Sequence, residues 1–257
     1  MECFVHADKK YFPEYNWFEK AISYPYKAPT TSFTFKNGKF YQGIHISLKD
    51  RVPILSIGSN RSPYQLKNKF GVKENLCVTP AKLYNSVIVY AASMSAYGSI
   101  PATQWPCEGS VSDLNLLWLN QDQLQIMHLS EGLGIAYHYV ELDKNTVAIQ
   151  DDDYSGSIFG YISTRGGYLF DGNEPFRLKN IKTNTNTHSS INEYQALNKL
   201  FLENPDGQTS LETWLKNFIS NKSKRFSLID KMSKKSLLPK HIPWKILDLK
   251  VSGNNIY

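Results

Sequence analysis

The sequence predicts an α+β fold, with a mixed β-barrel or sheet followed by a helical C-terminal region. Apolar runs rich in β-forming residues dominate residues 30–165, whereas patterns with helical spacing dominate the remainder. The chain has 257 residues, of which 41% are hydrophobic and only 20% are charged. This composition supplies enough apolar surface to bury a core, so we expect a folded protein.

The N-terminal third contains the clearest turn signals. Asn37-Gly38 separates two β-rich runs and is typical of a two-residue hairpin turn. Residues 53–57 are typical of a short buried strand, which runs into a loop at residues 58–61. Ser62-Pro63 then predicts the N-cap and first residue of a helix that ends at Gly71.

The middle of the chain predicts further strands around one helix. Residues 87–92 and 114–119 are expected to be strands, joined by a connection rich in Gly, Ser and Pro over residues 96–110. Asn120, with Gln123 at the capping-box position, predicts a helix that ends near Gly132. Two more strands are expected, at residues 135–142 and 157–163, and Asp151–Asp153 between them is interpreted as a solvated turn.

The C-terminal part predicts a polar linker at residues 183–190 and amphipathic helices at 191–202 and 210–220. We therefore divide the chain into three parts. These are an N-terminal extension packed on the core (1–50), a central domain (51–182) and a helical, basic C-terminal appendage (183–257).

Charge is concentrated near the C-terminus. The net charge is +6, and residues 216–245 contain nine Lys and Arg against one Asp, which gives +8 there and −2 elsewhere. Such a stretch can dock on nucleic acid or an acidic membrane surface. Few aromatic residues are interleaved with it, so we interpret it as a solvated surface and do not expect nucleic-acid binding.

Composition also indicates a compartment and excludes several kinds of site. No apolar run reaches the roughly 18 residues of a membrane span, and the N-terminus lacks the apolar core of a secretory signal. Cys3, Cys77 and Cys107 lie far apart, and the six histidines show no metal-ligand spacing. We expect a cytoplasmic protein with no membrane association, disulfide or metal site.

The segment Gly58-Ser59-Asn60 is the first candidate site. A glycine between a strand and a helix allows a sharp turn, and free N–H groups at the helix start can bind a carboxylate or a developing oxyanion. The alternative is an ordinary polar turn, since these three residues are common in turns.

Glu131 is the second candidate. It follows Leu124, Met127 and His128 at helical spacing, so a carboxylate shares a face with two apolar side chains. A partly buried carboxylate suits a general base. The alternative is an exposed glutamate near a helix end, because other apolar residues lie on the opposite face.

The order of these segments resembles the γ-glutamylcyclotransferase family over residues 53–142. The motifs that carry the resemblance follow one another along the chain: Gly58–Asn60, like the family's Y-G-S-N; Ala81-Lys82-Leu83, like its A-R-L; Gly98–Thr103, like its G-x-x-x-A-T; the turn Glu108-Gly109; the strand 111–119; and Leu124 to Glu131-Gly132 with the following Tyr137.

The resemblance implies a small mixed β-barrel with flanking helices and a cavity at the Gly58–Asn60 loop. It also implies a cofactor-independent reaction that releases 5-oxoproline from a small γ-glutamyl substrate by intramolecular amine attack. Glu131 would then be the general base, and residues 57–61 and Tyr137 would bind the substrate.

Two positions depart from the family pattern and leave the substrate's identity open. Ile57 stands where the family has a tyrosine, and Arg61 stands where it has an apolar residue. Arg61 adds a cation that can bind the substrate's α-carboxylate. The alternative is that Arg61 points into solvent at the end of the loop. The alternative function is a non-catalytic binding module on the same fold that uses the basic C-terminal region, and the sequence does not specify an oligomeric state.

Overall fold

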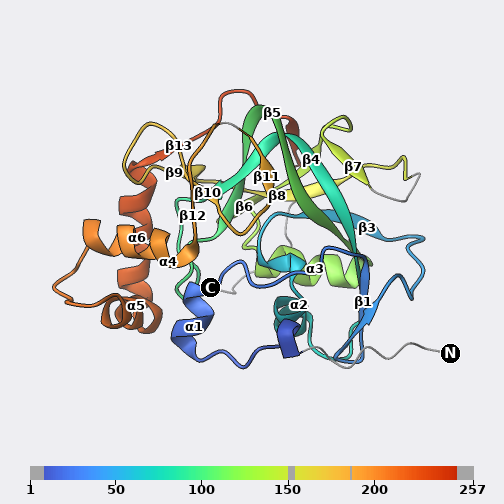
Figure 1. Ribbon diagram of the computed structural model, residues 1–257, viewed down its shortest axis with the longest axis horizontal. Coiled ribbons are helices and arrows are strands. Elements are labelled where there is room, and N and C mark those ends of the chain that lie inside the picture. The colour runs from blue at the N-terminus through green and yellow to red at the C-terminus, as the bar shows by residue number, and fades with distance from the viewer. Residues whose placement is uncertain (1–8, 150–153, 186, 248–257) are drawn as a thin grey trace.

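The computed structural model describes residues 9–149, 154–185 and 187–247 (Figure 1). Cys3 and Asp151–Asp153 lie outside these ranges. Within the described residues, the chain forms one large mixed sheet with helices against it, which confirms the α+β class. No helix in these ranges is long and apolar enough to cross a membrane.

Eight of the twelve strands in the main sheet follow one continuous order. They are β12 (Ser190–Ile191), β10 (Arg177–Leu178), β4 (Leu76–Tyr90), β5 (Ala102–Leu119), β3 (Val52–Ser56), β8 (Phe159–Ser163), β6 (Tyr137–Leu142) and β14 (Trp244–Ile246). The β3–β8 and β10–β12 pairs are parallel, and the other pairs along this order are antiparallel.

Shorter strands attach to the sides of this order. β1 (Phe33–Lys36) pairs with β2 (Lys39–Gln42) across the Asn37-Gly38 turn, as predicted, and β1 also pairs with β4. β7 (Val147–Ile149) pairs with β4, and β11 (Thr183–Asn184) pairs with β5. A separate pair consists of β9 (Gly167–Tyr168) and β13 (Ser236–Leu237).

The described strands do not form a closed barrel, contrary to the expectation from the family resemblance. The end strands β12 and β14 contain only two and three residues, and each pairs on one side only. Closure requires the two end strands to pair with each other, so the sheet is open along this path.

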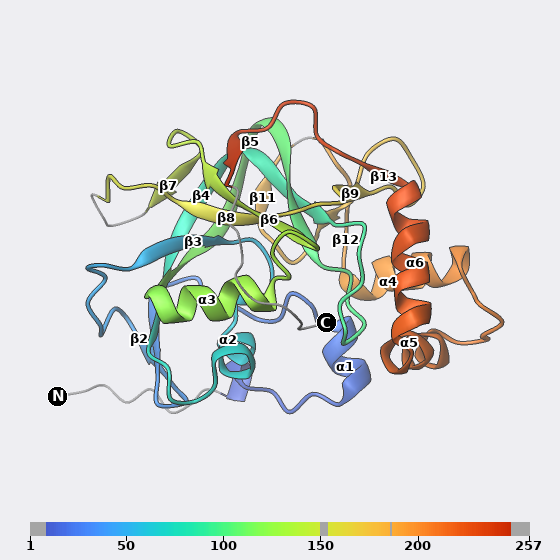
Figure 2. The same ribbon diagram turned by 180° about the vertical axis from the view of Figure 1, so that it is seen from behind.

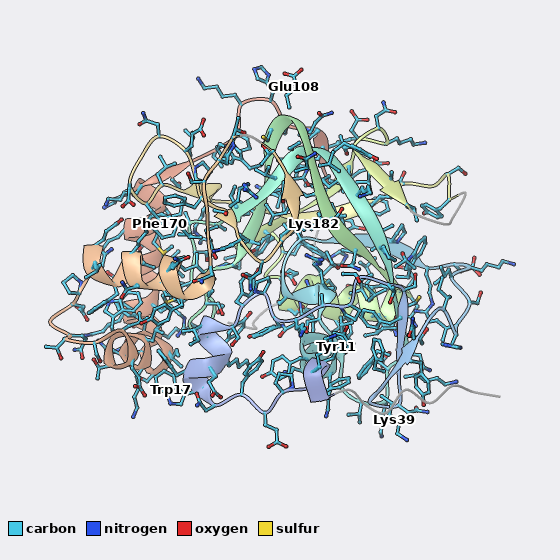
Figure 3. All side chains as sticks on the ribbon, viewed as in Figure 1. Tyr11, Trp17, Lys39, Glu108, Phe170 and Lys182 are labelled. Carbon is cyan, nitrogen blue, oxygen red and sulfur yellow. The ribbon has the colours of Figure 1, made fainter. Side chains whose placement is uncertain are left out.

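β4 and β5 form the longest strand pair. Their extent shows that one predicted boundary, that of the connection between them, is wrong. The expected connection over residues 96–110 is shorter, because β5 already begins at Ala102. The turn-forming residues lie inside the strand pair at an irregularity between Tyr84 and Ser86, where Asn85 Oδ1 accepts from the N–H of Gly109 at 2.9 Å. A bulge therefore accommodates residues that usually end strands. Figure 3 shows nearby Glu108 at the top of the view, at the bend within β5 and on the opposite side of the molecule from Trp17.

Two helices lie against one face of the sheet (Figures 1 and 2). α2 (Pro63–Phe70) begins after the N-cap Ser62 and ends at Gly71, which has φ +81°, and α3 (Gln121–Ser130) begins with the predicted Asn120 capping box. The short segments η1 (Lys9–Tyr11), α1 (Trp17–Ile22) and η2 (Ser59–Arg61) complete the N-terminal half.

The C-terminal helices are α4 (Glu193–Glu203), α5 (Leu211–Ser220) and α6 (Lys222–Lys234). α4 and α5 confirm two predictions, whereas α6 falls in the basic stretch interpreted as a solvated surface. Leu228, Ile229 and Met232 bury one face of α6 while its lysines remain exposed. The expected linker at residues 183–190 is also wrong, because β11 lies in it and β12 begins in it.

Candidate functional site

The predicted loop joins β3 to α2 in one tight turn. Ile57 is buried, and Ser59–Arg61 form the single 3₁₀ turn η2. The N–H of Gly58 donates no hydrogen bond to a described residue. This loop therefore retains an N–H donor of the kind that binds anions.

Glu131 lies next to this loop, at the C-terminal end of α3. Its Oε1 atom accepts a hydrogen bond from Asn60 Nδ2 at 3.0 Å and forms an ion pair with Lys69. The side chain of Glu131 is 15% exposed. The structure thus brings together two segments that were singled out separately in the sequence.

Lys69 was not predicted as part of this arrangement. It lies in the last turn of α2, its side chain is only 8% exposed, and its Nζ atom also lies 3.4 Å from Met127 Sδ. The sequence did contain a signal that Lys69 is partly buried. Lys69 comes three residues after Leu66 and one before Phe70, which are buried positions of α2. A lysine next to a buried helix face is expected to need a counter-charge.

The Asn60–Glu131 contact leaves two acceptor atoms unused. Glu131 Oε2 accepts no hydrogen bond from a described residue, and Asn60 Oδ1 is buried without a partner. Both atoms are acceptors, so this arrangement suits a donor such as an ammonium group.

Arg61 points back toward the sheet and does not extend into solvent. Its Nε atom donates to Asn115 Oδ1 on β5 at 2.7 Å. Burial lowers the pKa of Arg61 to about 10, and nearby Asp113 opposes the shift. The Nη groups donate no hydrogen bond to a described residue, so they retain donors for an anion.

Tyrosine hydroxyls surround the loop. Tyr137 donates to the carbonyl of Ala102 at 3.0 Å, and burial followed by the charge of Glu131 raises the pKa of Tyr137 well above its usual range. Tyr97 interacts with Ser59, and burial raises the pKa of Tyr97 to about 12. Both hydroxyls are therefore neutral at ordinary pH. Tyr137 was among the predicted site residues, whereas Tyr97 was not.

A second buried carboxyl group, Glu193, lies near these tyrosines. It is 1% exposed, its Oε1 atom accepts from the N–H of Ile100 at 2.7 Å, and its Oε2 atom has no partner. Burial raises the pKa of Glu193 well above its usual range, although the Ile100 N–H opposes this shift. Glu193 therefore fixes the turn before β5 through this hydrogen bond, while burial disfavours its charged form.

Replacing Glu193 with glutamine is expected to change the pH dependence of stability. The folded-state pKa of Glu193 lies above the unfolded value, so wild-type stability falls as the pH rises through that interval. The slope approaches about 1.4 kcal/mol per pH unit. Urea denaturation between about pH 5 and pH 8 should show a smaller decline for Glu193→Gln. Parallel curves for the two proteins would contradict this.

Two cavities lie elsewhere on the molecule. One of about 250 Å³ lies between the end of α4 and α6, and one of about 380 Å³ lies between the end of β6 and β14. Neither is lined by the loop or by Glu131, whose carboxylate contacts the side chains of Lys69 and Asn60. Among the residues with described positions, no group of three His, Cys, Asp or Glu is arranged to hold a metal ion.

No protein-family model and no curated protein sequence matches the chain. Among solved structures, the chain is similar to one named "Gamma-glutamyl cyclotransferase", with 17% sequence identity and a TM-score of 0.38. The similarity covers 44% of this chain and 67% of that chain.

Proposed function

We propose that this chain is a γ-glutamylcyclotransferase-like enzyme that releases 5-oxoproline from a γ-glutamyl compound. The observation that carries this proposal is the hydrogen bond from Asn60 to Glu131, two residues 71 positions apart in the sequence. The family resemblance pairs the loop with this glutamate, and the contact agrees with that pairing.

In the proposed reaction, the α-amine of the γ-glutamyl group attacks its own γ-carbonyl carbon. A new C–N bond closes the ring, and the C–N bond to the leaving amine then breaks. The nucleophile is tethered to its electrophile, so the substrate itself supplies proximity. The α-nitrogen loses two protons between the ammonium group and the ring N–H. The protein must take up the first before the attack and deliver one proton to the leaving nitrogen as its C–N bond breaks, and the other goes to the released amine or to solvent.

Glu131 fits the role of the proton carrier. The unused Glu131 Oε2 and Asn60 Oδ1 atoms offer two acceptors to the ammonium group. Lys69 balances the buried negative charge on the other carboxylate oxygen. The N–H of Gly58 is available to the oxygen that gains charge in the tetrahedral intermediate.

Arg61→Ala is expected to raise the KM several-fold and to change kcat little. The α-carboxylate is not altered by ring closure, so a residue that binds it contributes equally to the ground state and the transition state. The free Nη groups of Arg61 are donors for this carboxylate. Steady-state kinetics would measure both constants, and an unchanged KM would remove Arg61 from the substrate site.

The proposal is tested by incubating the purified chain with γ-glutamyl amino acids, glutathione and γ-glutamyl amines. Chromatography would detect 5-oxoproline, and a heat-denatured sample would correct for spontaneous cyclisation. We expect release from at least one of these classes. If none yields 5-oxoproline above the background, the proposed function is wrong.

One observation favours a second candidate, a non-catalytic binding module. The Lys69–Glu131 contact also has the arrangement of a structural ion pair. The working surface would then be α6, where Lys222, Lys231 and Lys234 are exposed, while Lys224 and Lys235 pair with acidic residues. Stability measurements on Lys69 variants, described in the Discussion, address the ion pair directly.

A further inference from the structure

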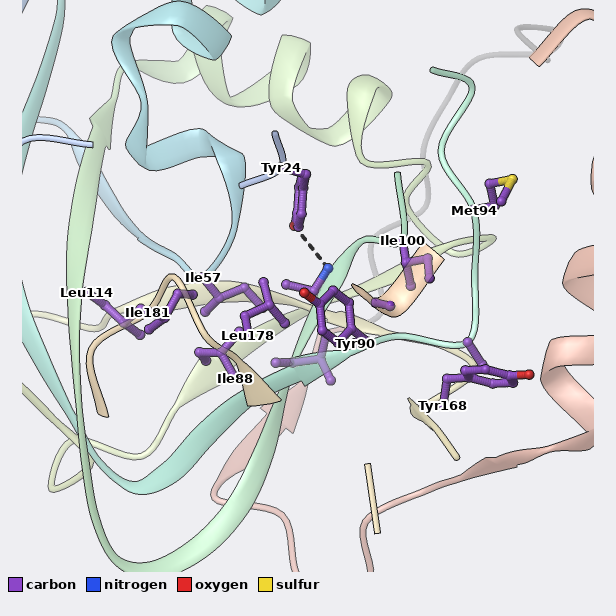
Figure 4. Close-up of a cluster of buried hydrophobic side chains, with 14 of the residues drawn as sticks. Tyr24, Ile57, Ile88, Tyr90, Met94, Ile100, Leu114, Tyr168, Leu178 and Ile181 are labelled. Atoms are coloured by element: carbon purple, nitrogen blue, oxygen red, sulfur yellow. Dashed lines mark hydrogen bonds between the residues drawn. The ribbon is translucent and has the colours of Figure 1, made fainter. Parts of the chain in front are cut away.

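Tyr24 brings a hydroxyl group from the N-terminal segment to the loop. It lies two residues after α1 and is 4% exposed. Its hydroxyl oxygen accepts a hydrogen bond from the N–H of Ala102 at 3.0 Å (Figure 4). Because Tyr137 binds the carbonyl of the same residue, both hydroxyls lie at the start of β5.

The Tyr24 hydroxyl also lies against the backbone of Gly58. A Cβ atom added to Gly58 would lie 2.2 Å from this hydroxyl oxygen and 3.5 Å from Ala102 Cβ. No side chain fits at such a distance unless Tyr24 moves. The hydroxyl is therefore a direct neighbour of the loop that carries the free N–H group.

The proton of this hydroxyl has no acceptor among the described residues. The oxygen accepts from Ala102, and no hydrogen bond donated by Tyr24 is formed with the rest of the described chain. Burial, followed by the neighbouring Tyr137 and Tyr97, raises the pKa of Tyr24 well above its usual range, so the proton is retained. Leaving a buried donor without an acceptor destabilises the free protein, and a ligand that accepts the proton would remove that cost.

We propose that Tyr24 donates a hydrogen bond to the γ-carbonyl oxygen of the bound substrate, beside the Gly58 N–H. This inference rests on the proposed function and adds the N-terminal segment to the site. As the α-nitrogen bonds to the γ-carbonyl carbon, this oxygen gains negative charge, and the hydroxyl stabilises it without transferring its proton. The ring carbonyl of 5-oxoproline retains the same oxygen, so the product is a probe of the same contact.

Tyr24→Phe keeps the ring and removes the hydroxyl. We expect at least a tenfold loss of kcat/KM per folded molecule, since loss of one such donor costs up to roughly 10²–10³-fold. Tyr168→Phe is the matched control, because Tyr168 is 1% exposed and its hydroxyl donates to Glu203 at 2.8 Å, away from the loop. An active protein in which Tyr24→Phe changes kcat/KM no more than the control overturns the inference and leaves the proposed function intact.

Gly58→Ala provides a second variant that keeps Tyr24 but displaces its hydroxyl. If both substitutions remove one contact, the loss of kcat/KM in Gly58→Ala/Tyr24→Phe should be smaller than the product of the two single losses. If the loss in the double variant equals the product of the two single losses, the two substitutions do not act on the same contact. If Tyr24→Phe alone folds too poorly to assay, Gly58→Ala/Tyr24→Phe is compared with Gly58→Ala alone, because removing the hydroxyl makes room for the alanine Cβ. The contact is already lost in Gly58→Ala, so a further loss of kcat/KM in the double variant would contradict the inference.

Binding of 5-oxoproline, measured by calorimetry, separates failure of this inference from failure of the proposed function. If the wild-type chain releases no 5-oxoproline from any γ-glutamyl compound, the proposed function is wrong. Binding that weakens in Tyr24→Phe and not in Tyr168→Phe would still support the Tyr24 contact. Binding that does not depend on Tyr24, or no binding at all, would overturn it.

Discussion

Replacing Glu131 with glutamine is expected to lower the rate of 5-oxoproline release by roughly 10²–10⁴-fold. Glutamine has nearly the same shape and can still accept a hydrogen bond from Asn60, but it cannot take up the α-ammonium proton. The loss should appear mainly in kcat, because the proton moves during ring closure. Single-turnover measurements with the substrate that the screen identifies would give this rate.

Glu141→Gln is the matched control for this substitution. Glu141 lies on β6, is partly buried and accepts a hydrogen bond from Ser157, but it does not contact the loop. Its replacement should leave the rate within about twofold. Activity must be expressed per folded molecule, since Glu131→Gln leaves the Lys69 ammonium group without its counter-charge. Undiminished release by folded Glu131→Gln would assign the proton transfer to another group.

Elements defined by local signals could be predicted from the sequence. Asn120 with Gln123, Ser62-Pro63 and Asn37-Gly38 each act over a few residues, and each marks the boundary that the structure has. The β4–β5 pair shows where such signals fail. Pro106 and Gly109 are turn-forming residues, yet pairing with a long neighbouring strand keeps them in β5 at a bulge.

Helix α6 was not predicted individually, although residues 183–257 were expected to form a helical appendage. Its lysines dominate the local composition, whereas its stability depends on Leu228, Ile229 and Met232 packing against the other buried side chains of the core. Tertiary packing, and not charge, decides that this segment is helical.

The candidate site divides in the same way. The loop and Glu131 were found because each occurs in a short motif. Lys69 and Tyr24 were not, because each contributes through a contact with a residue distant in sequence, 62 positions for Lys69–Glu131 and 78 for Tyr24–Ala102. The spacing of residues in the sequence does not indicate such long-range contacts, because they depend on the folded topology.

Lys69→Met is expected to lower the free energy of unfolding by about 2–4 kcal/mol. Methionine fills a similar volume, so the loss is chiefly that of the charge opposite Glu131. Breaking a buried ion pair leaves one charge in a poorly solvated position. Lys69 and Glu131 are only 8% and 15% exposed, so this pair is nearly buried. Urea denaturation monitored by tryptophan fluorescence would measure the change.

Lys224→Met removes a comparable ion pair from the surface and is the control. Lys224 and Asp206 are 45% and 41% exposed, so this loss should not exceed about 1 kcal/mol. Lys69→Met/Glu131→Leu should recover most of the stability, because an apolar pair of similar volume carries no desolvation cost. If Lys69→Met lowers the free energy of unfolding no more than Lys224→Met does, the fold does not need Lys69 as the counter-charge of Glu131. Recovery of stability in the double variant, with loss of 5-oxoproline release, would mean that the charged pair is retained for chemistry and not for folding.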